Sequence, residues 1–192
     1  MSELKLDAKT AIVVIDLQKG IVGMPGNPHP AQTVIANSVK LLDAGRAAGA
    51  LAVLVHVGFA ADFGDALQSP VDEPMRASGE RPADWMELIP ELKQQPGDVA
   101  IFKRQWGAFY GTDLDLQLRR RGVKTIVLCG IATEIGVEST ARDAYERGYA
   151  VVLAEDAMTG RSGHENSVKH IFPRLGRVRS TAQIVEALTA AS

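Results

Sequence analysis

Short apolar segments recur along the chain, each about as long as a β-strand. The first, residues 11–15, is an uninterrupted apolar run rich in β-branched residues, which is typical of a strand buried on both faces of a sheet. Similar runs predict further strands at 51–57, 99–102, 125–129 and 150–154, with a short last strand at 176–179. The sequence therefore predicts about six strands.

Between several of these runs, the apolar residues follow a helical spacing instead. We expect helices over 31–48 and 112–121, which end at Gly49 and Gly122, because glycine commonly follows the last turn of a helix. Alternating strands and helices predict a parallel sheet with helices on both faces. The expected architecture is a doubly wound, Rossmann-like α/β fold, formed by residues 1–192 as a single domain.

Three predicted helix starts carry residue pairs typical of a capping box, in which a side chain at the N-cap and one three residues later each bond the other's backbone N–H. The pairs are Thr112 with Asp115 as a variant, Ser162 with Glu165, and Ser180 with Gln183. We expect helices to begin at these three places.

Two irregular segments interrupt the alternation of strands and helices. Residues 20–30 are rich in glycine and proline, and residues 58–82 combine Gly, Pro and Asp with apolar Phe59, Phe63 and Leu67. A connection as long as the second is more often a functional loop or lid than a second domain. Both segments follow predicted strand ends, and ligands of open α/β sheets bind beyond the carboxyl ends of the strands.

The composition limits the classes of function. Hydrophobic residues make up 46% and charged residues 23%, as in an average globular protein, which excludes a disordered chain and a coiled coil. The formal net charge of -2 provides no basic surplus, so nucleic acid and anionic membranes are not expected partners. No apolar run approaches the roughly 18 residues of a membrane helix, and the charged start is unlike a signal peptide. We expect a cytoplasmic protein.

Polar residues at predicted strand ends are the first candidates for chemistry. Asp16 follows the first strand and Lys103 the third, and neighbouring strand ends would bring this carboxylate and ammonium into one crevice. Taken singly, an Asp in this position often only accepts loop amide hydrogens, and most lysines are solvated. The ammonium favours an ionised Asp16 whereas burial favours the neutral acid, so the sequence leaves open whether Asp16 acts as a base or as an acid.

The other reactive or aromatic side chains have structural interpretations. Cys129, the single cysteine, lies within an apolar run and is expected to be a buried strand residue rather than a nucleophile. It has no partner for an intrachain disulfide, which fits a reducing compartment. His56 is expected either to line the pocket or to be a hydrogen-bonded structural residue. Trp106, Phe109 and Tyr110 are expected to pack internally or against another subunit.

Signatures of cofactors and of a serine nucleophile are missing from the sequence. We find no G-x-G-x-x-G after the first strand, no P-loop and no G-x-S-x-G elbow. The four histidines form no H-x-x-x-H or H-x-H pair, so we expect no metal. The expected protein needs no cofactor.

Three motifs in order along the chain resemble the signatures of the isochorismatase-like hydrolases. They are IDLQ at 15–18, KRQWGAFYGT at 103–112 and GIATEIGVESTARDA at 130–144. The match spans nearly the whole chain and most resembles the YecD-type branch, a poorly characterised set of bacterial proteins that lack the catalytic cysteine. The resemblance implies the α/β fold already predicted and hydrolysis of a small molecule.

The resemblance also implies roles for individual residues. In cysteine-hydrolase members the triad is Asp, Lys and Cys; the Asp falls on Asp16 and the Lys on Lys103, but the cysteine position, six residues after Gly130, is Gly136. The metal ligands of nicotinamidases have no clear match either. Members that cleave the vinyl ether of isochorismate also have glycine at the cysteine position. In them the Asp is implicated as the acid that protonates the vinyl carbon before water attacks.

The resemblance further implies a cis peptide before Ala132, which aims the backbone amides of Ala132 and Gly136 into the site as anion donors. Candidates for the pocket wall are His56, Phe59, Trp106 and Thr133. We therefore expect a homo-oligomeric hydrolase with Asp16 as acid or base and Lys103 as its charged partner. The alternatives are a non-catalytic binding protein that has lost the nucleophile, and a structural oligomer.

Overall fold

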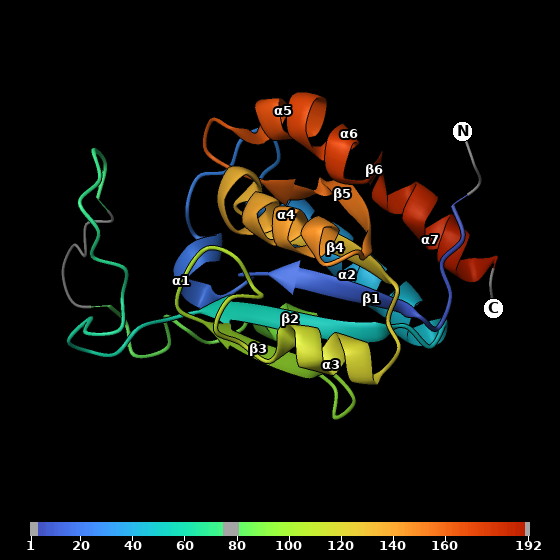
Figure 1. The fold of residues 1–192 in the computed structure, drawn as a ribbon, viewed down its shortest axis with the longest axis horizontal. Helices are drawn as coiled ribbons and strands as arrows, with labels where there is room; N and C mark the ends of the chain where they lie inside the picture. Colours follow the sequence, from blue (N-terminus) through green and yellow to red (C-terminus); the bar gives the residue numbers. More distant parts are fainter. Residues whose placement is uncertain (1–3, 75–80, 191–192) are drawn as a thin grey trace.

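A single six-stranded sheet forms the centre of the computed structural model, which describes residues 4–74 and 81–190. The strands are β1 (Thr10–Ile15), β2 (Leu51–Val57), β3 (Val99–Lys103), β4 (Thr125–Ile131), β5 (Ala150–Thr159) and β6 (Arg177–Arg179). All of them pair in parallel, in the order β3-β2-β1-β4-β5-β6 (Figure 1). The order runs outward from β1 in both directions, which confirms the doubly wound fold. Residues 75–80 of the predicted loop lie outside the described residues.

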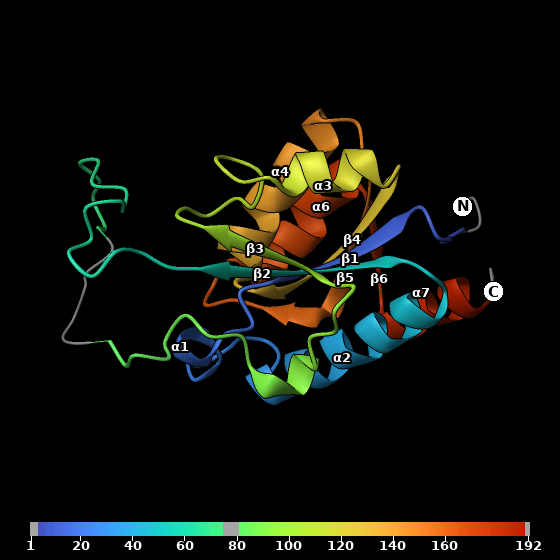
Figure 2. The same cartoon turned by 90° about the horizontal axis from the view of Figure 1, so that it is seen from below.

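Helices cover both faces of the sheet, as Figure 2 shows. One face carries α1 (Lys19–Val22), α2 (Ala31–Ala47) and α7 (Thr181–Thr189), and the other carries α3 (Leu114–Arg120), α4 (Glu138–Glu146) and α6 (Phe172–Leu175). The remaining helical segments are the 3-10 helix η1 (Pro90–Leu92), α5 (His164–Asn166) and two π-helical segments, η2 (Thr133–Val137) and η3 (Ser167–Ile171). Within 4–74 and 81–190, no helix is long and apolar enough to cross a bilayer.

The two-sided cover explains the uninterrupted apolar runs. In β1, Ala11, Val13 and Ile15 belong to the core beneath α3 and α4, whereas Ile12 and Val14 belong to the core beneath α2 and α7. All five side chains are fully buried. Because successive side chains of a strand point to opposite faces, both sets must be apolar, and no polar alternation appears in the sequence.

Strand β5 is longer than the predicted 150–154. Its pairing with β4 shifts register between Leu128 and Gly130 and resumes with Gly130 opposite Met158. The acidic residues Glu155 and Asp156 lie in this irregular part, and they end the apolar run from which the strand was predicted. The register shift therefore hides the second half of β5 from a periodicity argument.

One of the three capping predictions is confirmed. Ser180 caps α7, accepting the N–H of Gln183, and the Gln183 side chain accepts the Ser180 N–H at 3.0 Å.

The segment 20–30 was predicted to be irregular, but its first residues belong to α1.

The other two capping predictions are wrong. The Thr112 hydroxyl donates 2.6 Å to the carbonyl four residues earlier, and α3 begins two residues after it. The Ser162 N–H donates to the carboxylate of Glu134, so Ser162 is part of a turn and α5 begins at His164. The Thr112 hydroxyl still accepts the Leu114 N–H at 3.2 Å, but from one position before the N-cap, whereas the Ser162 N–H that a capping box would use is bonded to Glu134.

Residues 58–74 and 81–88, here called the arm, project away from the sheet in both views (Figures 1 and 2). The guanidinium of Arg81 lies 4.3 to 5.4 Å from the ring centres of Phe59, Phe63 and Trp85, and so holds the outgoing and returning parts together. Leu67 remains 68% exposed. The arm is therefore fastened near the sheet and presents apolar side chains to solvent.

Gly130 is the glycine whose backbone most constrains the sheet. It adopts φ +118, and a Cβ there would lie 2.1 Å from the Ile15 carbonyl oxygen. We expect Gly130→Ala to lower the free energy of unfolding by about 3 kcal/mol or more, measured by urea denaturation. The control is Gly23→Ala, where φ is −78 and no atom lies within 4 Å of the added methyl group. Equal stabilities of the two variants would contradict this account.

Candidate active site

Asp16 lies at the carboxyl end of β1, where the backbone turns out of the sheet. Its φ of +53 is in the left-handed region, which Asp tolerates better than most residues. Its N–H still donates to the Val55 carbonyl at 2.9 Å, as a strand residue would. The residue is 5% exposed. The turn therefore places a buried carboxyl beyond the end of the sheet.

Lys103 reaches Asp16 from a strand that is not adjacent. The prediction that the two follow neighbouring strands is wrong, because β2 lies between β1 and β3. Two strand spacings amount to about 10 Å, and the long lysine side chain crosses β2 to close that distance. Its Nζ lies 2.8 Å from Asp16 Oδ2, and the residue is 2% exposed. The structure thus brings together the two residues singled out from the sequence.

The Lys103 ammonium has three acceptors for its three protons. Besides Asp16 Oδ2, it donates to the carbonyl oxygens of Gln105 at 3.0 Å and Trp106 at 2.9 Å. An ammonium has three donors and no acceptor, so these contacts satisfy it. Lys103 is therefore suited to hold a charge in place rather than to deliver a proton.

Asp16 has the opposite character, because one of its oxygens is not satisfied. Among the described residues, no group bonds the buried Oδ1. Burial raises the pKa of Asp16 to about 6, and the attraction and hydrogen bond of Lys103, which lower it, only partly offset that effect. The carboxyl can therefore gain or lose a proton near neutral pH, and Oδ1 is the atom at which it would do so.

Gly136, at the cysteine position, lies directly against this pair. A Cβ built on Gly136 would be 3.3 Å from Asp16 Oδ2 and 3.0 Å from the Ile15 Cγ2. It belongs to η2, which follows a cis peptide between Ile131 and Ala132, as the motif resemblance implied. Ala132 itself is half-buried. The carboxyl thus adjoins peptide backbone where cysteine hydrolases have a thiol.

Cys129 does not replace the missing nucleophile. It is fully buried in β4, within the core beneath α2, and its Sγ is 3.9 Å from the Val13 carbonyl oxygen. Burial raises the pKa of its thiol to about 12. The thiol therefore stays protonated at neutral pH, which confirms the structural interpretation of this residue.

Two predicted wall residues lie toward the arm. His56 is half-buried at the end of β2; its Nδ1 bonds the Met86 carbonyl at 2.8 Å, and its ring lies 4.8 Å from that of Phe102. Phe59 lies in the arm, beneath Arg81. The contacts found for His56 match the structural alternative, and a role of either residue in binding stays a prediction.

The other two wall candidates lie near η2 and the loop after β3. Thr133 is fully buried, and its hydroxyl bonds His164 Nδ1 at 2.9 Å. The Trp106 side chain is 60% exposed, while its carbonyl accepts from Lys103. In the part of the chain that the structure describes, no group of three or more His, Cys, Asp or Glu residues could hold a metal.

Thr140 is a buried residue of this region that the sequence reasoning missed. Its hydroxyl donates 2.7 Å to the Gly136 carbonyl and accepts the Ala108 N–H at 3.1 Å. It therefore ties the loop after β3, which carries the acceptors of Lys103, to the turn that carries Gly136. The available signal was a threonine four residues after Gly136, because threonine in a helix can bond the carbonyl of the preceding turn.

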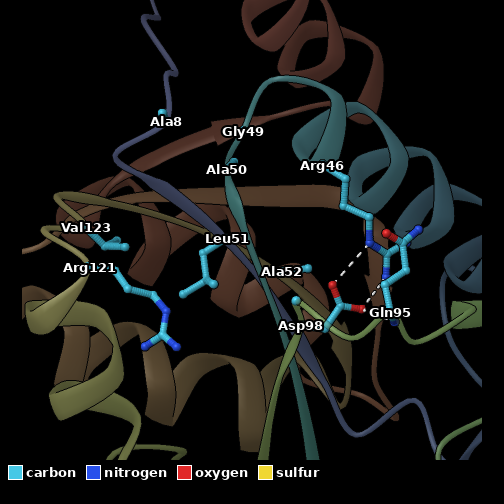
Figure 3. Close-up of a pocket in the computed structure, with 11 residues that line it drawn as sticks. Ala8, Arg46, Gly49, Ala50, Leu51, Ala52, Gln95, Asp98, Arg121 and Val123 are labelled. Atoms are coloured by element: carbon cyan, nitrogen blue, oxygen red, sulfur yellow. Dashed lines mark hydrogen bonds and ion pairs between the residues drawn. The ribbon is translucent and has the colours of Figure 1, made fainter.

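A hollow of about 440 Å³ lies at the opposite edge of the sheet, near the amino ends of the strands (Figure 3). It is lined in part by Arg46, Leu51, Asp98 and Arg121. Arg46 and Asp98 point toward each other and form an ion pair at 2.6 Å. None of the predicted site residues lines this hollow.

The pKa of Asp16 can be tested without a substrate. We expect Lys103→Met to raise this pKa from about 6 to about 7 or higher, because the ammonium lowers it and methionine keeps the apolar bulk. Titration of 13C-labelled aspartate by NMR measures the change. Lys40→Met, on the exposed side of α2, is the control. An unchanged or lower pKa in Lys103→Met would contradict the ion pair.

Comparison with known proteins agrees with this geometry. A model of the isochorismatase domain matches residues 10–183. The chain is 53% identical over 188 residues to the isochorismatase family protein YecD of Escherichia coli O157:H7, covering 96% of this chain and 100% of YecD. It is 32% identical over 208 residues to the ureidoacrylate amidohydrolase RutB of Variovorax paradoxus, covering 95% of this chain and 82% of RutB.

A solved structure shows the same fold. An isochorismatase family protein from Burkholderia thailandensis superposes with a TM-score of 0.92 and 44% sequence identity, over 98% of this chain and 100% of that protein. The matched region contains both Asp16 and Lys103, and the similarity to YecD agrees with the branch that the motifs indicated. The chain therefore belongs to the isochorismatase family of hydrolases.

Proposed function

We propose that the chain is a cytoplasmic, single-domain and cofactor-free hydrolase that cleaves a vinyl ether of a small carboxylic acid, with Asp16 as the acid and water as the nucleophile. One observation carries this proposal. The carboxyl of Asp16 has a pKa raised to about 6 and a buried Oδ1 without a partner among the described residues, and it adjoins Gly136 instead of a thiol. The site can therefore supply a proton but no covalent nucleophile.

The proposed reaction needs only these groups and water. Asp16 Oδ1 transfers its proton to the terminal vinyl carbon, which leaves an oxocarbenium ion and the Asp16 carboxylate. Lys103 stabilises that carboxylate through its 2.8 Å contact. Water adds to the oxocarbenium carbon and returns a proton to Asp16, and the resulting hemiketal collapses to an alcohol and a ketone. The backbone amides of Ala132 and Gly136 are the proposed donors to the substrate carboxylate.

Amide hydrolysis, the activity named for RutB, is less well supported by this site. A thiolate pathway forms a covalent adduct with a cysteine. Gly136 has no side chain, and Cys129 is fully buried in the opposite core. Attack of water on a protonated vinyl ether requires neither a thiolate nor a covalent adduct.

Turnover of enolpyruvyl ethers by purified protein tests the proposal. Asp16→Asn should lower kcat/KM by about a hundredfold or more, the usual scale of acid catalysis. In the unmodified protein kcat/KM should fall as the pH rises through about 6, because the acid form of Asp16 is then lost. The control, Asp43→Asn, changes an exposed carboxylate on α2. A rate that instead rises through pH 6 would assign Asp16 as a base and refute the acid mechanism.

Alkylation of the folded protein provides a second test. Iodoacetamide should leave hydrolysis unchanged, and mass spectrometry should find no adduct, because the Cys129 thiol is buried and its pKa is raised to about 12. In urea, the same reagent should label Cys129 fully, which verifies the reagent. Labelling of folded protein together with loss of hydrolysis would restore a cysteine mechanism.

The alternative is a binding protein that does not turn its ligand over. The glycine at position 136 favours this reading, because it removes the nucleophile used by cysteine hydrolases in the family. The same panel of enolpyruvyl ethers and primary amides separates the two functions. Thermal stabilisation of the protein by a compound that is never hydrolysed would support the binding protein.

We also propose that the protein is a homo-oligomer with contacts through the arm or residues 106–110. Leu67 is 68% exposed, and Trp106 and Tyr110 are 60% and 74% exposed, so both segments present large side chains that a second subunit would cover. Of two double variants, Leu67→Glu with Val71→Glu in the arm and Trp106→Glu with Tyr110→Glu after β3, at least one should sediment as a smaller species than the unmodified protein. Leu116→Glu on α3 is the control. A monomer at micromolar concentration of unmodified protein would refute this proposal.

A further inference from the structure

Strand β2 continues beyond the point where β1 leaves it. The pairs between the two strands end with Ile15 opposite Val55, and the last ladder bond runs from the Asp16 N–H to the Val55 carbonyl. Asp16 then turns with φ +53. The next β2 residue facing the same side is Val57, two residues further on, and the β1 backbone is no longer opposite to pair with it.

The side chain of Gln18 takes the place of that backbone. Its Oε1 accepts the Val57 N–H at 2.8 Å, and its Nε2 donates to the Val57 carbonyl at 2.9 Å. One carboxamide thus makes with Val57 the pair of bonds that a residue of an antiparallel neighbouring strand would make through its own N–H and carbonyl. The second N–H of the amide donates to the Trp85 carbonyl at 3.1 Å, where the arm returns to the sheet. Gln18 is fully buried.

Gln18 also closes the turn that holds Asp16. Its backbone N–H donates to the Asp16 carbonyl at 2.9 Å. The turn is therefore bonded to β2 at two places: the Asp16 N–H donates to Val55, and the Gln18 side chain bonds Val57. The same side chain also bonds Trp85, where the arm returns to the sheet.

We infer that Gln18 is a positioning residue, whose side-chain amide replaces a missing strand residue opposite Val57 and thereby holds the Asp16 carboxyl against Lys103. This role deepens the proposed function and rests on it, because it explains how a non-glycine residue at a left-handed turn keeps its carboxyl in one place. Among the described residues, no hydrogen bond joins the Gln18 side chain to Asp16 Oδ1 or to Gly136, so Gln18 acts through the backbone.

Only an amide of this length meets the requirement. Methionine has nearly the same shape but would leave the Val57 N–H and the Val57 carbonyl without their partner, whereas the Trp85 carbonyl would keep only its bond from the Gly20 N–H at 3.0 Å. Glutamate would keep the acceptor but lose both donors and place a carboxylate against two carbonyl oxygens. Asparagine has the same donors and acceptor, but its side chain is one methylene group shorter and so places the amide too far from Val57.

The test compares Gln18→Met with Gln183→Met, which removes an exposed glutamine amide from the cap of α7. Two measurements need no substrate. Amide hydrogen exchange at Val57 should accelerate at least tenfold in Gln18→Met. In the same variant, NMR titration of 13C-labelled aspartate should move the Asp16 pKa downward from about 6, because water then reaches the carboxyl and removes the effect of burial, which is larger than the opposing effect of Lys103. Gln183→Met should change neither.

Faster exchange at Val57 with an unchanged Asp16 titration would overturn the inference, since Gln18 would then fasten only β2 and the arm. If Gln18→Met does not fold, Gln18→Asn is measured in the same way and judged by the same two results. With a substrate that the unmodified protein hydrolyses, Gln18→Met should lower kcat at least tenfold and leave KM nearly unchanged. Absence of hydrolysis in the unmodified protein would refute the proposed function, whereas the titration would still decide the role of Gln18.

Discussion

The structure depends on keeping one ion pair, Asp16 with Lys103, out of water. Removing two charges from solvent costs several kcal/mol per ion in general, and their attraction offsets this only where further hydrogen bonds satisfy them. Lys103 meets that condition with two backbone carbonyls besides Asp16. Asp16 meets it only in part, because Oδ1 is left over among the described residues. Burial of the incompletely satisfied carboxyl outweighs the attraction of Lys103 and so raises the pKa of Asp16 to about 6.

Several parts of the fold follow from this pair. The loop after β3 must present two carbonyls to the ammonium, and Thr140 and Gln105 hold that loop through bonds to its backbone. The turn after β1 must present the carboxyl, and the bonds to β2 hold it. The close approach of Gly130 to the Ile15 carbonyl brings β4, and with it η2, against the same turn. The site is thus assembled from three strand ends whose backbones are held by contacts within the chain.

The sequence predicted the parts of this arrangement that depend on local pattern. Buried strands have uninterrupted apolar runs, so the sheet was predictable, and polar residues directly after those runs identified Asp16 and Lys103. It did not predict that β2 separates the two residues, because strand order depends on contacts between distant segments. The left-handed turn at Asp16 and the hydrogen bonds of Thr140 also depend on contacts between distant segments, so they were not predicted either. Sequence spacing does not encode which backbone groups a side chain will meet across the fold.

The single cysteine, enclosed in the core beneath α2, has a consequence for where the protein can work. Enzymes with a thiolate nucleophile are inactivated when peroxide oxidises that sulfur to a sulfenic or sulfinic acid. Such oxidation follows thiolate character and exposure, and Cys129 has neither. With glycine at position 136 and acid chemistry at Asp16, the proposed reaction involves no oxidisable atom of the protein. A hydrolase built in this way would keep its activity during oxidative stress that disables the cysteine-dependent members of its family.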